Sequence, residues 1–463
     1  MKPIYLDYNA TTPIDPRVRE AMLPFLDNYF GNPSSTHWYG VQSKLAIEKA
    51  RRQVAEFLGC EPDEIYFSSG GSESNNLAIK GIALAEGRRS GHIITTSVEH
   101  PAVLEVCKFL QKRGFEVTFV RVDEFGRVAA EEIERAIRPD TVLISVMHAN
   151  NEVGTVQPIM EIAQAAAAHG VLLHSDAAQS AGKIPVRVKE LGVDLLSIAG
   201  HKLYAPKGIG ALYVRRGVTP EKQIHGASHE RNLRAGTENV LEIVGLGAAC
   251  ELAGRELSKR QAWTAARTEQ LTSGLTKRLP NIRINGHPTH RLPNTVSVSF
   301  YGLDAHTILS ELKDIAASAG AACHAEGTEI SHVLTAMGLT PEWSLGTIRF
   351  SVGSPTTEDE IDRAVEQVVT TVGRLRDREG GAAQVISADV RLTQFTHGLG
   401  CACKLRPQLL EEVLAMLPKP THPAVLVGAE SSDDAAVYRL DDQTAIVQTV
   451  DFFTPIVADP YQF

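Results

Sequence analysis

The sequence predicts an α/β fold in which a parallel or mixed β-sheet is covered by helices. Short apolar runs alternate with amphipathic, helix-like stretches over most of the chain. The apolar runs are hydrophobic on both faces, which is typical of strands buried between two layers of helices. Each run ends in polar residues, and ligands bind at the carboxyl ends of strands in such sheets. The sequence therefore predicts a site at that edge.

The expected elements follow the chain in order. Strands are expected at 92–100, 115–123, 141–150, 170–179 and 194–202, with helices such as 102–114 and 159–170 between them. A long polar helix at 255–279 would lead into a smaller α+β unit. That unit would contain a strand at 294–300, a helix from Ala305, the small-residue segment 317–327, a strand at 347–353 and a helix at 358–376.

These elements suggest three units. We expect a large domain at about 15–255, and a small domain formed by the N-terminal segment together with about 256–377. A charged, Gly/Ala-rich linker is expected at 378–389, followed by a separate partial α/β segment at 390–463.

Composition excludes several functional classes. The 463 residues carry a net charge of −9, which argues against sequence-independent nucleic-acid binding. No apolar stretch reaches the roughly 18 residues that span a bilayer, so no membrane association is expected. Six cysteines are too few for a disulfide framework in a chain of this length, and no signal peptide is evident. We therefore expect a cytoplasmic protein with reduced thiols.

Three motifs carry candidate chemistry. In the first, a strand runs through Ser68-Ser69-Gly70-Gly71-Ser72 into a helix whose free N–H groups suit an anion; the alternative is a glycine turn capped by Ser72. In the second, Asp176 ends a buried strand and needs a cation or donor, or else makes a structural hydrogen bond. In the third, Lys202 follows a strand, where desolvation would suit it to Schiff-base chemistry, although most lysines are solvated.

Together the motifs supply a phosphate cradle, a pyridinium partner and a Schiff-base lysine, which are the requirements of pyridoxal phosphate. His100, between a strand and a helix, could stack on the cofactor ring, or it could be a core or cap residue. No other lysine in the pattern follows a strand at the proposed site.

Residues from the start to about Asp377 resemble the cysteine desulfurases of the class V aminotransferase-like superfamily. The matching segments are YLDYNATTP, GNPSS, SSGGSESNNLAIKG, VEHPAV, MHANNEVG, DAAQS, GHK, PKGIGALYVRR, GASHERNLRAGTENV, AGAACH and IRFSVG. The resemblance implies a fold type I large domain with a mixed, mostly parallel sheet, and a small α+β domain.

The resemblance also implies roles for individual residues. Lys202 would hold the cofactor covalently, His100 would stack and relay protons, and Cys323 would be the nucleophile. The implied cofactor-binding residues are Gly71, Ser72, Asn151, Asp176, Gln179, His201 and Thr237. Thr237 would reach the partner subunit's cofactor, which implies a homodimer. The implied substrate-binding residues are Arg349 and Asn32.

The segment around Cys323 supports the nucleophile role from its residues as well. Cys323 stands among small residues that are poor core material and favour a flexible loop, from which a thiolate could deliver sulfur to a partner. Cys60, Cys107 and Cys250 lie in helix-like or turn contexts and are interpreted as structural. The resemblance adds Cys323 as a transient ligand of an iron–sulfur cluster in transit.

One position departs from the resembling family. Relatives usually have a serine two residues before the His-Lys pair, where its hydroxyl binds phosphate, and here Ala199 stands there. One phosphate bond should therefore be missing, at a cost of about 1 kcal/mol if nothing replaces it.

Residues from about Val390 to Phe463 resemble the N-terminal part of selenophosphate synthetase, through RLTQFTHGLGCACK, LLEEVL, LVGAESSDDAAVY and VDFFTPIVADP. The resemblance implies a catalytic pair, Cys401 and Lys404, and two Mg²⁺ ligands, Asp434 and Asp451. Alternatives are an inert or metal-binding loop and a solvated turn. The family's later ligands have no counterpart here, so we expect Mg²⁺ only if the segment is completed.

The expected function is conversion of L-cysteine to L-alanine, with a Cys323 persulfide passed to an acceptor protein in iron–sulfur or selenium metabolism. The alternatives are a class V aminotransferase, a selenocysteine lyase acting on L-selenocysteine, and a non-catalytic sulfur- or selenium-carrier scaffold. Cys323 argues against the aminotransferase, because transamination needs no thiol.

Overall fold

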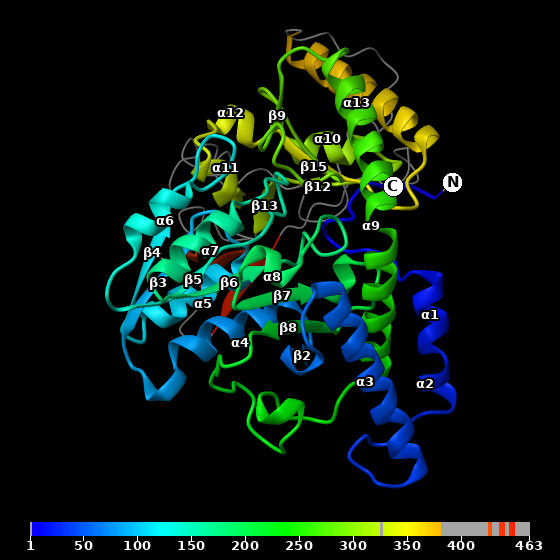
Figure 1. The fold of residues 1–463 in the computed structure, drawn as a ribbon. Coiled ribbons are helices and arrows are strands. Elements are labelled where there is room, and N and C mark those ends of the chain that lie inside the picture. Colours follow the sequence, from blue (N-terminus) through cyan, green and yellow to red (C-terminus); the bar gives the residue numbers. More distant parts are fainter. Residues whose placement is uncertain (1, 325–326, 381–424, 428–434, 440–443, 450–463) are drawn as a thin grey trace.

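The computed structural model describes residues 2–324, 327–380, 425–427, 435–439 and 444–449. Its centre is a seven-stranded sheet (Figure 1). In spatial order the strands are β2 (Ile65–Ser68), β8 (Gly210–Val214), β7 (Leu195–Ala199), β6 (Leu172–Asp176), β5 (Thr141–Ser145), β3 (Gly91–Thr96) and β4 (Phe115–Val120). β8 pairs antiparallel with both of its neighbours, and the remaining pairs are parallel. The prediction of a mixed, mostly parallel sheet is confirmed.

Each face of the sheet is buried against its own layer of helices. On β5, Leu143 packs into one core and its neighbour Ile144 into the other, because successive side chains of a strand point to opposite faces. The first layer is formed by α4 (Gly71–Ala83) and α5 (Pro101–Gln111). The second is formed by α3 (Trp38–Leu58), α6 (Ala130–Ala136), α7 (Ile159–Ala168), α8 (Val188–Leu191) and the first half of α9 (Val240–Thr276).

Helix α9 begins earlier than the sequence predicted. It starts at Val240 rather than near Arg255, and its buried first half contains Gly245 and Gly247. A Cβ on Gly247 would come within 2.6 Å of the Ala50 backbone on α3, so these glycines allow close helix packing. Glycine weakens a sequence-based helix prediction, which explains why this half was missed. The second half of α9 contributes Leu271 and Leu275 to a separate core.

That separate core is built on a four-stranded antiparallel sheet. In spatial order its strands are β12 (Ser318–Ala319), β15 (Thr347–Ser351), β10 (Thr295–Phe300) and β9 (Ile282–Asn285). The N-terminal segment belongs with it, because β1 (Ile4–Tyr5) pairs in parallel with β11 (Ile315–Ala316). Two helices pack on this core, α10 (Ala305–Glu311) and α13 (Glu358–Gly380).

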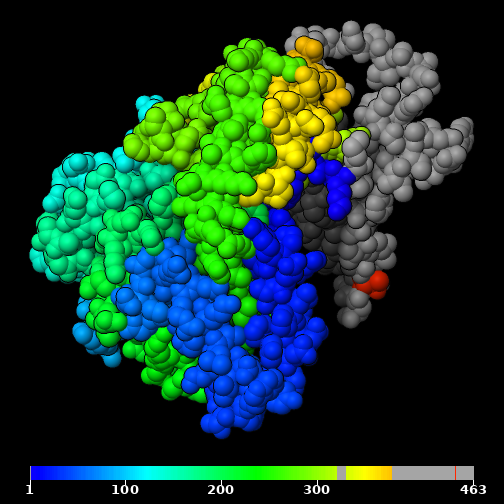
Figure 2. Space-filling model, turned by 45° about the vertical axis from the view of Figure 1, so that its right-hand side comes forward, coloured from blue at the N-terminus to red at the C-terminus, as the bar shows by residue number. Residues whose placement is uncertain are grey.

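The N-terminal helices lie along α9. α1 (Pro16–Met22) and α2 (Pro24–Asp27) contact it directly, and Figure 2 shows the N-terminal segment in blue beside the green helix. α1 begins where the sequence favours it: Asp15 accepts a bond from Arg17 N, and Pro16 occupies the first turn.

The remaining helices and strands are short. They are η1 (Pro62–Glu64), η2 (Ala85–Gly87), η3 (Gly200–Lys202), η4 (Glu230–Asn232), α11 (His332–Ala336), α12 (Pro341–Ser344), the hairpin β13 (Ala321–His324) and β14 (Gly327–Ile330), and an antiparallel sheet of β16 (Val425–Val427), β17 (Ala435–Arg439) and β18 (Ala445–Thr449). One prediction needs adjustment here. α13 continues through Gly380, so the first residues of the expected linker 378–389 are helical. Among the described residues, no helix has the length and apolarity to cross a membrane.

Candidate active site

The carboxyl ends of β6 and β7 bring two of the predicted residues to one edge of the large sheet. Asp176 is the last residue of β6 and pairs in register with Ser197 of β7. β7 ends at Ala199, and Lys202 follows it in the single turn η3. The topology therefore places the carboxylate and the lysine on the same edge, as the sequence predicted.

Asp176 is held in a fixed position at the bottom of the site. It is buried, and its Oδ2 accepts a bond of 2.6 Å from Asn75 Nδ2 of α4. Its Oδ1 accepts a bond of 2.8 Å from Ala178 N. These donors offset part of the cost of burying a carboxylate, and neither carries a positive charge. A carboxylate in this position is suited to a cationic partner such as a protonated ring nitrogen.

Lys202 lies over this edge with an unusually reactive amine. Its Nζ donates to the carbonyl oxygens of Asn9, at 2.5 Å, and Ala10, at 2.9 Å. The pKa of Lys202 is lowered to about 8, mainly by burial and in part by the nearby Arg349, against the opposing effect of Asp176. A lysine with a pKa near 8 is partly neutral at physiological pH, so it can act as a nucleophile or base.

The glycine segment forms a cradle beside Lys202. α4 begins at Gly71, and its N-cap Gly70 offers no side chain to the free N–H groups of the first turn. A Cβ on Gly71 would lie 3.3 Å from Ala199 Cβ, so Ala199 faces this cradle. His201 is next to Lys202, and burial lowers its pKa to about 4, which keeps its imidazole neutral. Neutral donors and a helix N-terminus are a suitable setting for a phosphate.

Arg349 connects the small sheet to this site. Its Nη2 donates to Asp7 Oδ1 at 2.8 Å and to Ser318 Oγ at 3.1 Å, and its Nη1 donates to Asn151 O at 3.0 Å. Its Nε is buried and has no hydrogen-bond partner. A buried guanidinium nitrogen without an acceptor fits an incoming carboxylate, in agreement with the predicted substrate role.

Two residues of this site were not found from the sequence. Lys183 Nζ donates to Gln179 Oε1 at 2.8 Å and to Asn9 Oδ1 at 2.9 Å. A second lysine therefore stands at the site, although Lys183 does not directly follow a strand and so lies outside the pattern that singled out Lys202. Lys183 follows Gln179 by four residues in a turn after β6, which was the available signal. Asn9 is fully buried, and its contacts depend on tertiary structure that the sequence pattern does not show.

The other predicted residues have different surroundings. His100 caps α5, because its Nδ1 accepts a bond from Ala102 N at 3.1 Å. The residue as a whole is exposed, but desolvation of its imidazole lowers the pKa of that ring. Ser72 is exposed on the first turn of α4. Asn32 lies exposed before α3, where its Oδ1 accepts from Ser34 N, and Thr237 is exposed in the loop before α9. The roles of Asn32 and Thr237 remain predictions.

Cys323 lies in a β-hairpin and not in the loop that the small residues suggested. Its backbone pairs with Thr328 between β13 and β14. The hairpin is fixed at one end by Gly320, whose N donates to Thr347 O in the small sheet at 2.7 Å. At the other end, Ser331 Oγ donates to Glu152 Oε2 at 2.5 Å. The nucleophile candidate therefore lies on a segment that is anchored on both sides.

The other large-domain cysteines have unreactive surroundings. Cys107 and Cys250 are buried and Cys60 is partly buried, and none of the three forms a disulfide. Burial raises the pKa of Cys60 and of Cys107 to about 12, and it raises the pKa of Cys250 as well. Thiols with such pKa values are almost fully protonated at neutral pH, so they are poor nucleophiles. This agrees with their interpretation as structural.

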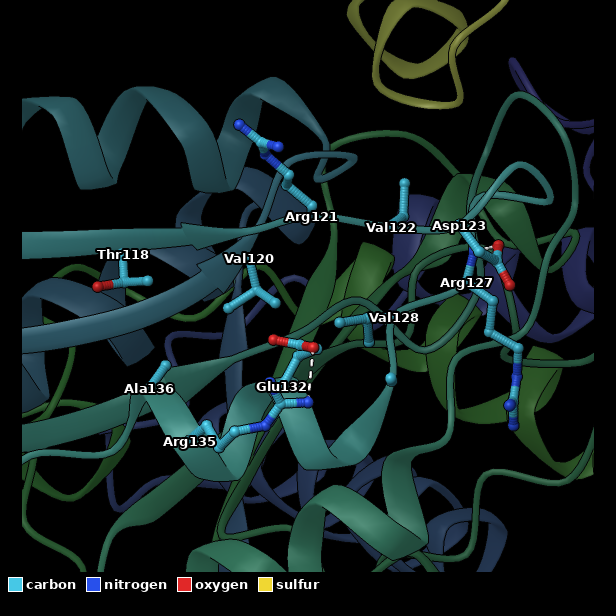
Figure 3. A pocket seen from close by; sticks show the side chains of 11 residues that line it. Thr118, Val120, Arg121, Val122, Asp123, Arg127, Val128, Glu132, Arg135 and Ala136 are labelled. Atoms are coloured by element: carbon cyan, nitrogen blue, oxygen red, sulfur yellow. Dashed lines mark hydrogen bonds and ion pairs between the residues drawn. The ribbon is translucent and has the colours of Figure 1, made fainter.

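A wider hollow lies elsewhere, between β4 and α6 (Figure 3). It has a volume of about 640 Å³, whereas the narrow cavity beside Lys183 and Lys202 has about 20 Å³. Its charged lining includes Glu132 and Arg135, which pair with each other at 2.6 Å. None of the residues that line it was predicted for the site, so size alone does not identify the reactive centre.

The predicted C-terminal residues lie outside the described residues. These are Cys401, Cys403, Lys404, Asp434 and Asp451. Among the residues that are described, no cluster of three or more metal-ligating side chains is present.

The arrangement as a whole fits pyridoxal phosphate. Asp176 offers a carboxylate that accepts from two neutral donors, Lys202 offers an amine, and Gly71 offers a cradle beside a helix N-terminus. These groups suit a ring nitrogen, an aldehyde and a phosphate respectively. The orphaned Nε of Arg349 suits the carboxylate of an amino acid.

Comparison with known proteins agrees with this chemistry. The family model described as aminotransferase class V matches residues 4–364. A protein named cysteine desulfurase IscS from Methanosarcina thermophila is 48% identical over 378 residues, which covers 81% of this chain and 93% of that protein.

Solved structures with a similar fold include proteins at about 40% identity to this chain. A structure described as a NifS-like protein superposes with a TM-score of 0.76 at 40% identity, covering 80% of this chain and 100% of the other. A structure described as SspA in complex with cysteine has a TM-score of 0.69 at 39% identity, covering 76% of this chain and 100% of the other.

Proposed function

The chain belongs to the class V aminotransferase family, and we propose that its site residues divide the work of a cysteine desulfurase between a fixed lysine centre and a separately anchored cysteine. The overall activity follows from relatives that carry the name cysteine desulfurase and match most of the chain: the protein is a pyridoxal phosphate-dependent cysteine desulfurase. L-Cysteine is its substrate, and the sulfur passes to an acceptor protein. What the proposal adds is the role of each residue.

The observation that carries the proposal is the meeting of Asp176, Lys202 and Gly71 at one sheet edge, with an unpartnered nitrogen of Arg349 beside them. Pyridoxal phosphate, when bound, supplies an electron sink for the substrate α-carbon. We assign Asp176 to the ring nitrogen, and Gly71, Ser72 and His201 to the phosphate. We assign Gln179 and Asn151 to the ring-oxygen side.

The chain's own residues then move the substrate's protons. Arg349, with Asn32, holds the substrate carboxylate, and the lowered pKa of Lys202 lets its neutral amine take the α-proton. His100, at the exposed edge of the site, relays a proton to or from solvent. These steps prepare the substrate's Cβ–S bond for cleavage.

Cys323 takes the sulfur. Its thiolate attacks the substrate's sulfur atom, so a sulfur–sulfur bond forms while the Cβ–S bond breaks, and the Cβ carbon gains a proton to give L-alanine. The product on the protein is a Cys323 persulfide, whose outer sulfur the acceptor removes. The high pKa values of Cys60 and Cys107 leave them unsuited to this step. We also propose that Cys323 serves as a transient ligand when the acceptor assembles an iron–sulfur cluster.

Product analysis tests the reaction class. The purified protein is given L-cysteine and a thiol reductant, and alanine, sulfide and keto acids are measured. We expect alanine and sulfide in equal amounts. A keto acid formed in step with consumed cysteine would indicate the aminotransferase instead, and a colourless protein without turnover would indicate a carrier scaffold.

We further propose that the protein acts as a homodimer. Large apolar side chains are exposed around α2, in the segment that follows it and at the start of α3, in the blue part of Figure 2. Phe30 is 75% exposed and stacks on Tyr39 at 5.2 Å, and Trp38 is 59% exposed. Exposed aromatic groups on this scale are typical of an interface. A second copy is the occupant that also gives the exposed Thr237 a role, at the partner subunit's cofactor.

The variant Phe30→Asp tests this surface. We expect it to shift the molar mass measured by light scattering from that of a dimer towards that of a monomer, because a carboxylate would be buried in the interface. Met160→Asp is the matched control, since Met160 is 52% exposed but lies on α7, away from this surface. A Phe30→Asp protein that keeps the dimer mass would contradict the proposal.

For the C-terminal segment we propose a link to selenium. Residues 390–463 resemble the start of selenophosphate synthetase, and desulfurases can also act on L-selenocysteine. We expect this 463-residue chain to make no selenophosphate, because phosphoryl transfer needs more Mg²⁺ ligands than Asp434 and Asp451. Comparing turnover of L-cysteine and L-selenocysteine, with and without residues 391–463, tests the link. A ratio of the two turnover rates that is unchanged by removing residues 391–463 would contradict the link, and selenophosphate formed from ATP and selenide would contradict the expectation that this chain makes none.

A further inference from the structure

Lys183 is a second lysine in the site, and the proposed mechanism does not use it. It follows β6 by a short turn and reaches back to the N-terminal segment. Its Nζ donates to Gln179 Oε1 at 2.8 Å and to Asn9 Oδ1 at 2.9 Å. Both acceptors are buried amide oxygens, from segments 170 residues apart in the chain. Lys183 therefore joins two parts of the site that nothing in the local sequence would hold together.

These bonds fix which way the two amides point. An amide oxygen can only accept, so a lysine at Oε1 requires that Gln179 turn its Nε2 elsewhere, and that nitrogen donates to Asn9 O at 2.9 Å. In the same way, Asn9 turns its Nδ2 towards Thr295 Oγ1, at 2.9 Å, and Asn151 O, at 3.2 Å. Without the lysine, Gln179 Oε1 would lose the N–H that it accepts from Lys183, whereas Asn9 Oδ1 would keep a bond of 3.0 Å from Asn294 Nδ2.

The same group of contacts sets the position of Lys202. Asn9 O accepts from Gln179 Nε2 and also from Lys202 Nζ, at 2.5 Å. Asn9 is thus the residue that Lys183, Gln179 and Lys202 all contact. Anything that holds Asn9 in place also holds the carbonyl oxygen on which the Lys202 amine rests before the cofactor arrives.

Lys183 can hold Gln179 and Asn9 in place without adding a positive charge to the site. Burial lowers its pKa well below the usual range for a lysine, and the nearby Lys202 and Arg349 act in the same direction. A neutral amine still has two N–H donors, which matches its two acceptors. A permanently charged residue there would place a third cation beside Lys202 and Arg349.

We propose that Lys183 is a positioning residue that fixes the amide orientation of Gln179 and, through Asn9, the resting place of the Lys202 amine. This inference rests on the proposed function, because it concerns how the site receives pyridoxal phosphate. It assigns Lys183 no contact with the substrate and no step in the reaction.

The test measures cofactor binding to the stripped protein. Pyridoxal phosphate is titrated into apoprotein of the wild type, Lys183→Met, Gln179→Ala and the double variant, and absorbance gives the dissociation constants. We expect Lys183→Met to weaken binding about tenfold, which is about 1.4 kcal/mol, the size of one to two net hydrogen bonds. Lys189→Met is the matched control, because Lys189 is exposed on α8, and we expect wild-type affinity from it.

The double variant separates positioning from general damage. If Lys183 acts through Gln179, the double variant should bind no more than about twofold more weakly than the weaker of the two single variants. Fully additive losses, or a Lys183→Met protein with wild-type affinity, would overturn the inference. Wild-type apoprotein that fails to bind pyridoxal phosphate would instead contradict the proposed function, so the two failures are distinguishable.

Discussion

The two side chains proposed to react, Lys202 and Cys323, are held in place in different ways. Lys202 follows the end of a buried central strand, and it contacts Asn9, which is hydrogen-bonded to Thr295 of the small sheet and to Gln179 in the turn after β6. Cys323 lies in the hairpin β13–β14, whose two strands pair only with each other and which is fixed through Gly320 and Ser331 at its ends. In the proposed mechanism the lysine holds a cofactor in one orientation, whereas the cysteine meets a substrate and then an acceptor. The difference in support matches the difference in task.

The largest effect on turnover should come from a substitution of Lys202. Lys202→Ala removes the amine that holds the cofactor and takes the α-proton, so we expect alanine formation to fall by at least about a thousandfold. Alanine release from L-cysteine measures this loss. Because Lys183 is a second amine in the site, Lys202→Ala/Lys183→Met should be compared in parallel. Near-normal turnover in the double variant would contradict the assignment.

Arg349 should show a smaller and different effect. Arg349→Met removes the cation placed for the substrate carboxylate, and we expect KM for L-cysteine to rise roughly tenfold to a hundredfold, the range of a charge-assisted bond. Steady-state kinetics with L-cysteine measure the change. An unchanged KM would mean that the unpartnered Nε does not face the substrate.

The pH dependence of cofactor loading tests the environment of Lys202. Only the neutral amine attacks an aldehyde, and burial lowers the pKa of Lys202 to about 8. The loading rate of apoprotein should therefore rise with pH and level off above about 8. Removing the positive charge in Arg349→Met should move the midpoint upward, because Arg349 lowers this pKa. A rate that rises steadily past pH 10 would indicate a solvated lysine.

A substitution at Ser331, which fixes one end of the hairpin β13–β14, tests how Cys323 is held in place. Ser331→Ala removes the bond to Glu152 and the N-cap of α11, where Ser331 Oγ also accepts from Val333 N. We expect persulfide formation to slow about fivefold, the effect of about 1 kcal/mol, with cofactor affinity unchanged. Ser310→Ala, at an exposed serine of α10, is the control. A loss of cofactor affinity in Ser331→Ala would mean that the hairpin that carries Cys323 also supports the cofactor site around Lys202.

The smallest effect is expected at Ala199. Its Cβ faces Gly71 at the cradle, and Ala199→Ser would add the hydroxyl that the family resemblance predicts at this position. We expect pyridoxal phosphate to bind about fivefold more tightly, by about 1 kcal/mol. Titration of apoprotein measures this, with Ala178→Ser as a comparison at a neighbouring position. Unchanged or weaker affinity would mean that another group already fills this place.

The surroundings of Lys202 and of Cys323 also differ in how well the sequence predicts them. The strands β3 to β7 were predictable because they are apolar on both faces, and their polar ends identified Asp176 and Lys202. Lys183 and Asn9 were not, because their contacts join segments far apart in the chain. The small residues around Cys323 predicted a loop, yet backbone pairing with β14 makes a strand. Local propensity is a weak guide where pairing decides the conformation.

The most direct test of the account is the location of the persulfide. The wild-type enzyme is given L-cysteine without reductant, its thiols are alkylated, and peptide mass spectrometry locates the added sulfur atom. The account predicts a persulfide on Cys323, and in Cys323→Ala it predicts bound cofactor with no persulfide at any other cysteine. A persulfide on Cys60, Cys107 or Cys250 of the wild type would contradict it.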